Sequence, residues 1–289
     1  MKIAAGDAAI VYTGPEVLLL CKIPDDQDDI PNKQQAANTG SKRLLHRKGG
    51  IFDLSKVIDC SYGQKFFWDS SDRWSVLLQP TGELITRTVT HRTQILYRAD
   101  ISLAILLLDL QPGKRVIECG TGSGSLTYSL ASSVAPTGCI FTFDFHNQRK
   151  LFAEEFFRQC NLTEIIKAYD RDAYLPGAFL VEGAVGGSSI DSVFLDLPSP
   201  WDALENAKMV LKNFGKIVTF SPTIEQSQRI CQAMSDAGFI EIKTFEILCK
   251  PWGIGFDDPD SAADTGFACY QLSQYNHTGY LTVSTLVKD

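Results

Sequence analysis

The chain has 289 residues, of which 44% are apolar and 21% are charged, and this composition is typical of a folded globular protein. At roughly 150 residues per domain, the length suggests about two domains. The 27 basic and 34 acidic residues leave a net charge of −7, so the chain either avoids nucleic acids or takes positive charge from a partner.

The cysteines and the apolar runs exclude several further classes. The 8 cysteines are scattered without C-x-x-C or paired Cys/His spacing, which predicts neither a metal site nor a disulfide scaffold. The longest apolar run, residues 101–110, is too short to span a membrane, and the N-terminus lacks the pattern of a secretory leader. We therefore expect a soluble intracellular protein that binds no metal and no membrane.

The first part of the chain is predicted to form a small β domain, residues 1–85. Short apolar segments between turns predict its strands at 8–12, 17–23, 65–68 and 74–78. Residues 24–40 are polar and lack an apolar period, which favours a mobile insertion loop.

Residues 86–289 are predicted to form an α/β domain. Apolar residues at three- and four-residue steps predict a helix over 93–110, and alternating strands and helices follow it. Such alternation is typical of a doubly wound, mostly parallel sheet. The predicted strands are 115–119, 140–144, one near 165, 192–196, 216–220, 241–248 and 280–286. One predicted helix ends at 134, and three others span 147–160, 199–211 and 221–237. Residues 249–278 are predicted to be a long surface loop.

A glycine-rich turn follows the first predicted strand of this domain. Gly120, Gly122 and Gly124 stand at alternate positions, where they let a ligand approach bare backbone at a helix N-terminus. Glu118 precedes them, and a carboxylate there suits a cationic ligand such as the amino-acid end of S-adenosylmethionine. Asp144, after the next strand, can accept hydrogen bonds from ribose hydroxyls, and Asp172 follows the third strand, within reach of an adenine ring.

The fourth strand of the α/β domain leads into the run FLDLPSPW, which contains Asp196. Ligands of open α/β sheets bind at the carboxyl ends of the strands, so Asp196 is expected to face the cofactor. Two prolines stiffen the backbone that follows. An acceptor beside a flat apolar surface suits a planar ring that carries an amine.

These motifs resemble one known family. ECGTGSGS, APTG, FLDLPSPW, FSPTIEQ, HRTQILY and HTGYL together resemble the catalytic subunits of eukaryotic tRNA (adenine-58-N1)-methyltransferases. The resemblance implies a class I, Rossmann-like methyltransferase fold, S-adenosylmethionine as donor and N1 of adenine 58 in the tRNA T-loop as acceptor. It also implies a nuclear location and a heterotetramer of two catalytic and two non-catalytic subunits. The non-catalytic subunit is expected to be a basic paralogue that binds the tRNA.

The matched motifs also imply roles for individual residues. Asp196 is the expected catalytic acid. The expected cofactor-binding residues are Leu96, Glu118, Gly120, Gly122, Ser123, Gly124, Ser125, Leu126, Thr127, Asp144, Arg149, Asp172, Ala173 and Asp196. The expected substrate-binding residues are His91, Arg92, Gln94, Tyr97, Leu195, Leu197, Pro198, Ser221, Pro222, Thr223 and His277. Residues 42–48, with Arg87, form a further basic candidate for RNA contact that equally fits a solvated face, and His277 equally fits a histidine satisfied within the fold.

Two other functions remain open at this point. The chain could methylate adenine N6, a protein or a small molecule with the same cofactor site. It could also be a binding subunit that has lost the cofactor, although the glycines and Asp196 are all present. Identification of the methylated nitrogen separates N1 from N6 chemistry.

Overall fold

The computed structural model describes residues 1–14, 17–25, 43–45, 51–67, 74–90, 94–250, 252–256, 266–270 and 277–288. Within these residues a seven-stranded sheet has the order β12-β15-β11-β10-β7-β8-β9. Its strands are β7 (Arg115–Cys119), β8 (Cys139–Asp144), β9 (Ile166–Asp170), β10 (Ile190–Leu195), β11 (Leu211–Ser221), β12 (Phe239–Glu246) and β15 (Tyr280–Leu286). The strands from β11 to β9 pair in parallel, whereas β15 pairs antiparallel with both β11 and β12.

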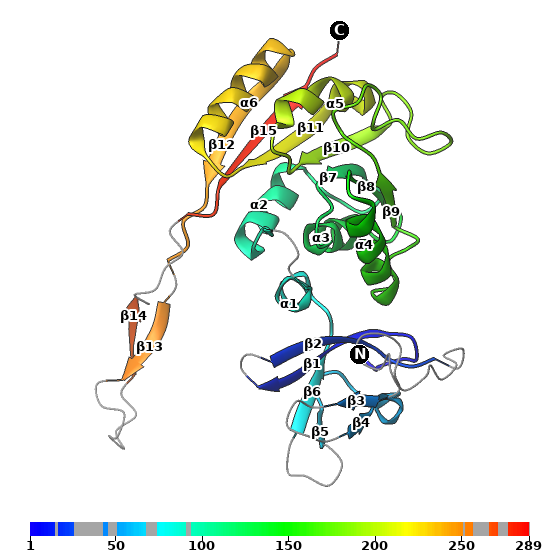
Figure 1. Cartoon of the computed structure of the whole chain (residues 1–289). Coiled ribbons are helices and arrows are strands. Elements are labelled where there is room, and N and C mark those ends of the chain that lie inside the picture. The colour runs from blue at the N-terminus through cyan, green and yellow to red at the C-terminus, as the bar shows by residue number, and fades with distance from the viewer. Residues whose placement is uncertain are drawn as a thin grey trace.

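Helices cover both faces of this sheet (Figure 1). On one side are α2 (Arg98–Leu107), α3 (Ser125–Val134) and α4 (Asn147–Gln159), and on the other are the 3-10 turn η2 (Pro200–Ala203), α5 (Leu204–Val210) and α6 (Ile224–Asp236). Neighbouring strand residues divide between the two resulting cores: Val116 packs on the α3 side and Ile117 on the α5 side. This alternation is the period of a strand buried on both faces, and the predicted doubly wound α/β fold is confirmed.

The strand order places a switch point between β7 and β10. From β7 the chain proceeds outward to β8 and β9, then returns to the other side of β7 as β10 and β11. The loops after β7 and β10 therefore leave the sheet next to each other and lead to helices on opposite faces, which is where open α/β sheets bind ligands.

A separate antiparallel sheet forms at the N-terminus, in the order β2-β1-β6-β5. Its strands are β1 (Ala8–Gly14), β2 (Val17–Lys22), β5 (Lys65–Phe67) and β6 (Trp74–Leu78), and the neighbouring elements are β3 (Arg43–Leu45), β4 (Ile51–Asp53) and η1 (Leu54–Val57). A small core that includes Val11, Leu54 and Leu77 lies beneath it. Most of the predicted insertion, 26–40, lies outside the described residues.

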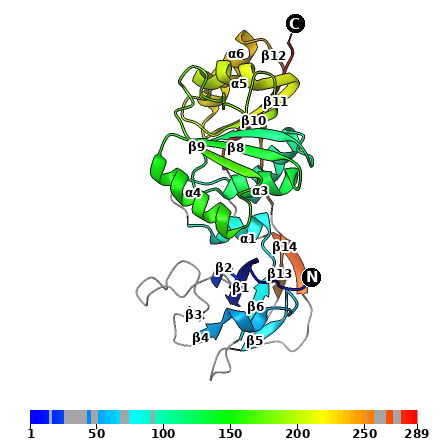
Figure 2. The same ribbon diagram turned by 90° about the vertical axis from the view of Figure 1, so that its right-hand side faces the viewer.

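The helix predicted over 93–110 is wrong in its bounds. A separate helix, α1 (Gly82–Thr88), precedes it, and α2 begins only at Arg98. α1 lies between the two sheets (Figures 1 and 2), and the predicted domain boundary near residue 85 falls within it. Thr81 caps α1 by accepting a hydrogen bond from the backbone N–H of Leu84 at 3.3 Å. Residues 94–97 are not helical, and 94–96 line the cavity described below.

Other boundaries also differ from the prediction. The predicted loop 249–278 contains a hairpin of β13 (Trp252–Phe256) and β14 (Gly266–Tyr270), which extends away from the large sheet (Figure 1). Residues 199–211 form η2 and α5 rather than one helix. The helix predicted from 221 begins at Ile224, because Thr223 is the residue that caps it, accepting from the Gln226 N–H at 3.4 Å. No helix among the described residues has the length and apolar character needed to cross a membrane.

Candidate active site

The glycine run after β7 forms a tight turn. Gly120, Gly122 and Gly124 have φ angles of 100°, 52° and 79°, a region that side-chain-bearing residues rarely occupy. At Gly120 there is a second requirement, because a Cβ atom there would lie 2.4 Å from the backbone oxygen of Asp196. The backbone N–H of Asp196 also donates to the Cys119 oxygen at 2.9 Å. The glycine turn and the loop after β10 are therefore in direct backbone contact.

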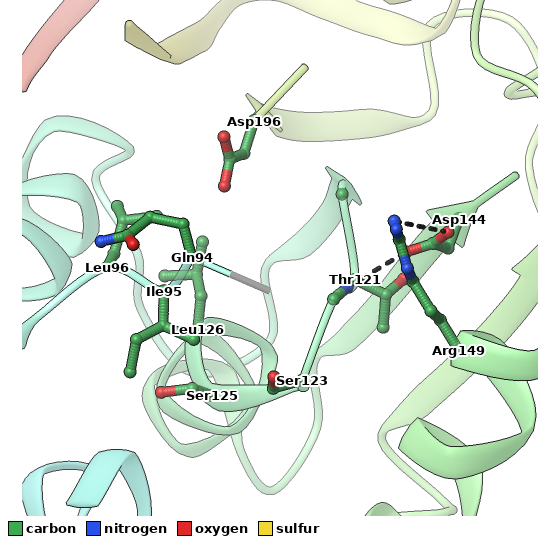
Figure 3. A pocket seen from close by; sticks show the side chains of 12 residues that line it. Gln94, Ile95, Leu96, Thr121, Ser123, Ser125, Leu126, Asp144, Arg149 and Asp196 are labelled. Carbon is green, nitrogen blue, oxygen red and sulfur yellow. Dashed lines mark hydrogen bonds and ion pairs between the residues drawn. The ribbon is translucent and has the colours of Figure 1, made fainter. Parts of the chain in front are cut away.

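A cavity of about 210 Å³ opens beside this turn (Figure 3). The residues that line it are Gln94, Ile95, Leu96, Gly120, Thr121, Gly122, Ser123, Ser125, Leu126, Asp144, Arg149 and Asp196. The structure thus brings most of the predicted cofactor residues together with one predicted substrate residue, Gln94. Ile95 and Thr121 were not predicted, although each stands between predicted residues within a matched motif.

Asp144 is the most firmly held acid of the cavity wall. It is 4% exposed, and its two carboxylate oxygens accept from the backbone N–H groups of Gly122 at 3.1 Å and His146 at 2.9 Å. The Arg149 guanidinium lies 4.0 Å from the same carboxylate. Because an ionised carboxylate has about four lone-pair sites, Asp144 keeps acceptor capacity for a ligand hydroxyl.

Glu118 lies beneath the cavity rather than in its wall. The side chain is fully buried, and its Oε2 accepts from the hydroxyls of Thr127 at 2.6 Å and Thr142 at 2.7 Å. Its Oε1 is buried without a hydrogen-bond partner in the described part of the chain. Burial, with a smaller contribution from the nearby carboxylates of Asp196 and Asp144, raises the pKa of Glu118 to about 8 against the lowering effect of the two threonine hydroxyls.

Asp196 is held through its backbone rather than through its side chain. Its carboxylate is directed into the cavity (Figure 3) and accepts no hydrogen bond from the described residues. Burial raises the pKa of Asp196 to about 6. Near neutral pH the group is therefore mostly an anion with free lone pairs, ready to accept from a ligand.

Several predicted residues do not reach the cavity. Gly124 and Thr127 belong to the turn and to α3 behind it, and Asp172 and Ala173 lie in the loop after β9. Leu195 is fully buried in the sheet core, and Leu197 packs against that core. Tyr97 is 50% exposed beside the cavity-lining residues 94–96. His91 and Arg92 lie outside the described residues, as do 42 and 46–48 of the basic candidate segment.

The FSP and HTGY motifs contact each other and do not line the cavity. The ring nitrogens of His277 lie 2.7 Å from Glu246 Oε1 and 3.1 Å from the Pro222 carbonyl oxygen. The carboxylate of Glu246, followed by the Pro222 carbonyl, raises the pKa of His277. Both partners are acceptors, so an imidazolium can donate to both at once. In this structure His277 is satisfied within the fold, and Ser221 is buried nearby.

Comparison with known proteins gives three kinds of match. Residues 73–265 match the sequence family described as tRNA methyltransferase complex GCD14 subunit. The tRNA (adenine(58)-N(1))-methyltransferase catalytic subunit trmt61a of Dictyostelium discoideum is 38% identical over 248 residues, 86% of this chain and 74% of that protein. The catalytic subunit TRM61 of Candida albicans is 35% identical over 244 residues, 84% of this chain and 72% of that protein.

Solved structures agree on the fold. The tRNA (m1A58) methyltransferase TrmI of Aquifex aeolicus superposes with a TM-score of 0.69 at 21% identity and covers 100% of both chains. A SAM-dependent O-methyltransferase of Thermotoga maritima gives 0.74 at 24% identity, over 100% of this chain and 96% of that one. At these identities the likeness extends to the architecture of both sheets and to nothing finer.

Proposed function

This chain belongs to the family of tRNA methyltransferase complex GCD14 subunits, and from that premise we propose that it is the catalytic subunit that methylates N1 of adenine 58 in tRNA. The observation that carries the proposal is the combination of the family match with an intact cavity into which Asp196 is directed, its carboxylate unpaired with any described residue. A subunit that had lost its donor site would not need to keep a bare glycine turn and a half-buried acid directed into the cavity.

The residues of the cavity fit S-adenosylmethionine as the donor. When bound, this molecule supplies an electrophilic methyl group on a positively charged sulfur. Asp144 has acceptor capacity for ribose hydroxyls, and the glycine turn lets the ligand approach the backbone without side-chain obstruction. The Asp144 carboxylate in the cavity wall places negative charge where it favours a cationic ligand.

Asp196 is proposed as the catalytic residue, and it acts as an ionised carboxylate that accepts a hydrogen bond. Adenine N1 has an in-plane lone pair and needs no base, so positioning is the main requirement. As N1 gains the methyl group, the ring becomes cationic and its N6 amine becomes a stronger donor. A hydrogen bond from N6 to the Asp196 carboxylate would therefore strengthen in the transition state, and this differential binding lowers the barrier.

The charge of the chain points to a partner. Affinity for tRNA depends on many Lys and Arg contacts to phosphate, and a chain with a net charge of −7 is poorly suited to provide them. We propose that a basic, non-catalytic paralogue supplies this surface in a two-plus-two heterotetramer located in the nucleus. Co-purification and fluorescence microscopy of a tagged chain test the assembly and its location.

The decisive experiment is a methyl-transfer assay on unmodified tRNA, with and without the co-purified partner. Mass spectrometry of the nucleosides should find 1-methyladenosine, and a tRNA that carries uridine at position 58 should receive no label. Appearance of N6-methyladenosine instead, or transfer to the uridine-58 tRNA, would show that the acceptor has been misassigned. No transfer by the complete complex would contradict the proposed activity.

A further inference from the structure

The loop that carries Asp196 is fastened from outside the cavity by a tyrosine. The hydroxyl oxygen of Tyr174 accepts a hydrogen bond from the backbone N–H of Ser199 at 3.1 Å. Ser199 stands three residues after Asp196 and between two prolines, so the intervening backbone has few ways to move. Restraint of the Ser199 amide therefore restrains the position of the Asp196 carboxylate.

Tyr174 itself comes from the loop after β9, and this loop is rigidly held. The Asn206 side chain, in α5, donates to the carbonyls of Ala173 and Leu175, each at 2.8 Å, and accepts from the Gly177 N–H at 2.8 Å. Asn206 is 5% exposed, so these bonds form in a protected environment. One side chain thus fixes the loop backbone at three points.

Within this loop, Asp172 fixes the backbone at Tyr174. Its Oδ1 accepts from the Tyr174 backbone N–H at 3.0 Å, which sets the direction in which the tyrosine leaves the loop. Burial raises the pKa of Tyr174 despite the opposing effect of the Ser199 N–H. The phenol therefore stays neutral near physiological pH and remains a stable acceptor for Ser199.

We propose that Tyr174 and Asn206 are positioning residues that couple the loop after β9 to the loop that carries Asp196. The inference rests on the proposed function, because it concerns the placement of Asp196 against the acceptor base. Asn206 holds the loop after β9 in place through three hydrogen bonds. Tyr174, in that loop, accepts from the Ser199 N–H, and this bond fixes the position of the Asp196 carboxylate in the cavity.

The test is Tyr174→Phe, which removes one hydroxyl and keeps the ring. Loss of a hydrogen bond of ordinary strength predicts that kcat falls about three- to tenfold, while the Kd of the donor, from calorimetry, changes less than about twofold. The matched control is Tyr169→Phe on β9, whose ring stacks on Phe143 at 5.2 Å and whose hydroxyl bonds to no described residue. That control should leave both quantities unchanged.

A second measurement needs no methyl transfer. If Tyr174→Phe loosens the loop, water reaches Asp196, and the pKa of its carboxyl falls from about 6 toward the ordinary value. Carbon-13 NMR of the labelled carboxyl group follows this pKa directly, and the acid limb of kcat should move the same way. The other ionisable groups around Asp196, namely Glu118, Asp144 and Arg149, are untouched by the substitution.

These outcomes separate the inference from the proposed function. An unchanged pKa of Asp196 in Tyr174→Phe overturns the positioning role whether or not tRNA is methylated. Wild-type kcat in an active Tyr174→Phe enzyme overturns it as well, as does an equal loss in Tyr169→Phe. An inactive wild-type complex contradicts the proposed function, while the NMR measurement still decides the role of Tyr174.

Discussion

The two sides of the cavity treat their carboxylates differently. On the side of β7 and β8, Asp144 and Glu118 each accept two hydrogen bonds from the protein. On the side of β10, Asp196 accepts none from the described residues, although its backbone contacts Gly120 and Cys119. The carboxylates on the methyl-donor side are thus bound by the fold, whereas the acceptor side has a half-buried carboxylate that is free to bind a ligand.

This difference suggests that one part of the cavity binds the methyl donor and the other takes part in methyl transfer. A carboxylate that is already hydrogen-bonded keeps its geometry and contributes to ground-state binding. A half-buried carboxylate without protein hydrogen bonds is only partly solvated, so a ligand N–H group that binds it gains a strong hydrogen bond. We expect variants on the donor side to change the Kd of the methyl donor, and variants at Asp196 to change kcat.

The largest effect is expected for Asp196→Asn. The variant keeps the size of the side chain and removes the charge that stabilises the cationic adenine, so kcat should fall by about 100- to 1000-fold. Titration calorimetry should show a nearly unchanged donor Kd. A large rise in that Kd with normal kcat would show that Asp196 binds the methyl donor rather than stabilising the transition state.

The kcat of the wild type is also expected to depend on pH. Asp196 accepts most strongly, and carries the charge that stabilises the cationic adenine, when it is ionised, and burial raises its pKa to about 6. The kcat of the wild type should therefore decline as the pH falls through about 6, and Asp196→Asn should lose that limb. A limb that persists in the variant would belong to another group.

The next effect is on stability and concerns the backbone contact between the two sides. Gly120→Ala forces a Cβ to within 2.4 Å of the Asp196 oxygen at a φ of 100°, which should cost about 2–4 kcal/mol. Gly186→Ala is the control, since nothing lies within 4 Å of its Cβ position, and it should stay within about 0.5 kcal/mol. Urea unfolding measures both, and equal midpoints would show that the contact is dispensable.

A pH-dependent effect is expected for Glu118→Gln. The folded protein holds a proton on Glu118 up to about pH 8, whereas the unfolded chain releases it near 4.5. Between these values the folded state binds more protons, so this group makes the wild type less stable as the pH rises. Relative to the wild type, Glu118→Gln should gain about 2–4 kcal/mol of unfolding free energy from pH 5 to pH 8. Urea unfolding at both pH values checks this, and a constant difference would contradict it.

The sequence was sufficient to predict that Asp144 and Asp196 meet at one edge of the sheet. Asp144 and Asp196 follow strands of the same parallel sheet, and the carboxyl ends of such strands share one edge, so their meeting required only the alternation of strands and helices. The glycine turn has an equally local signature. These features need no knowledge of contacts between distant side chains.

Features that depend on distant contacts were not predictable. The seven residues of α1 are too short for a clear apolar period, and the hydrogen bond from Ser199 to Tyr174 joins residues 25 positions apart. Neither leaves a pattern in the sequence. His277 shows the opposite case, in which a conspicuous motif residue binds Glu246 and Pro222 rather than lining the cavity.

The smallest effect, and the sharpest test of the comparison, is expected for Asp144→Asn. The amide keeps the size of the side chain and loses the charge, and it retains one acceptor oxygen in place of two. Because charge-assisted hydrogen bonds to a ligand weaken accordingly, the donor Kd should rise about tenfold. At saturating donor, kcat should stay close to that of the wild type, the reverse of the result at Asp196.

Asp170→Asn provides the matched control for this variant. Asp170 pairs in register with Asp144 on the neighbouring strand, but it accepts from the Asn147 side chain at 2.9 Å and does not line the cavity. Removal of its charge therefore changes the local electrostatics of the same sheet edge without removing a cavity acceptor. If Asp170→Asn weakened donor binding as much as Asp144→Asn, the effect would be one of general charge, and the hydrogen bonds of Asp144 would not explain it.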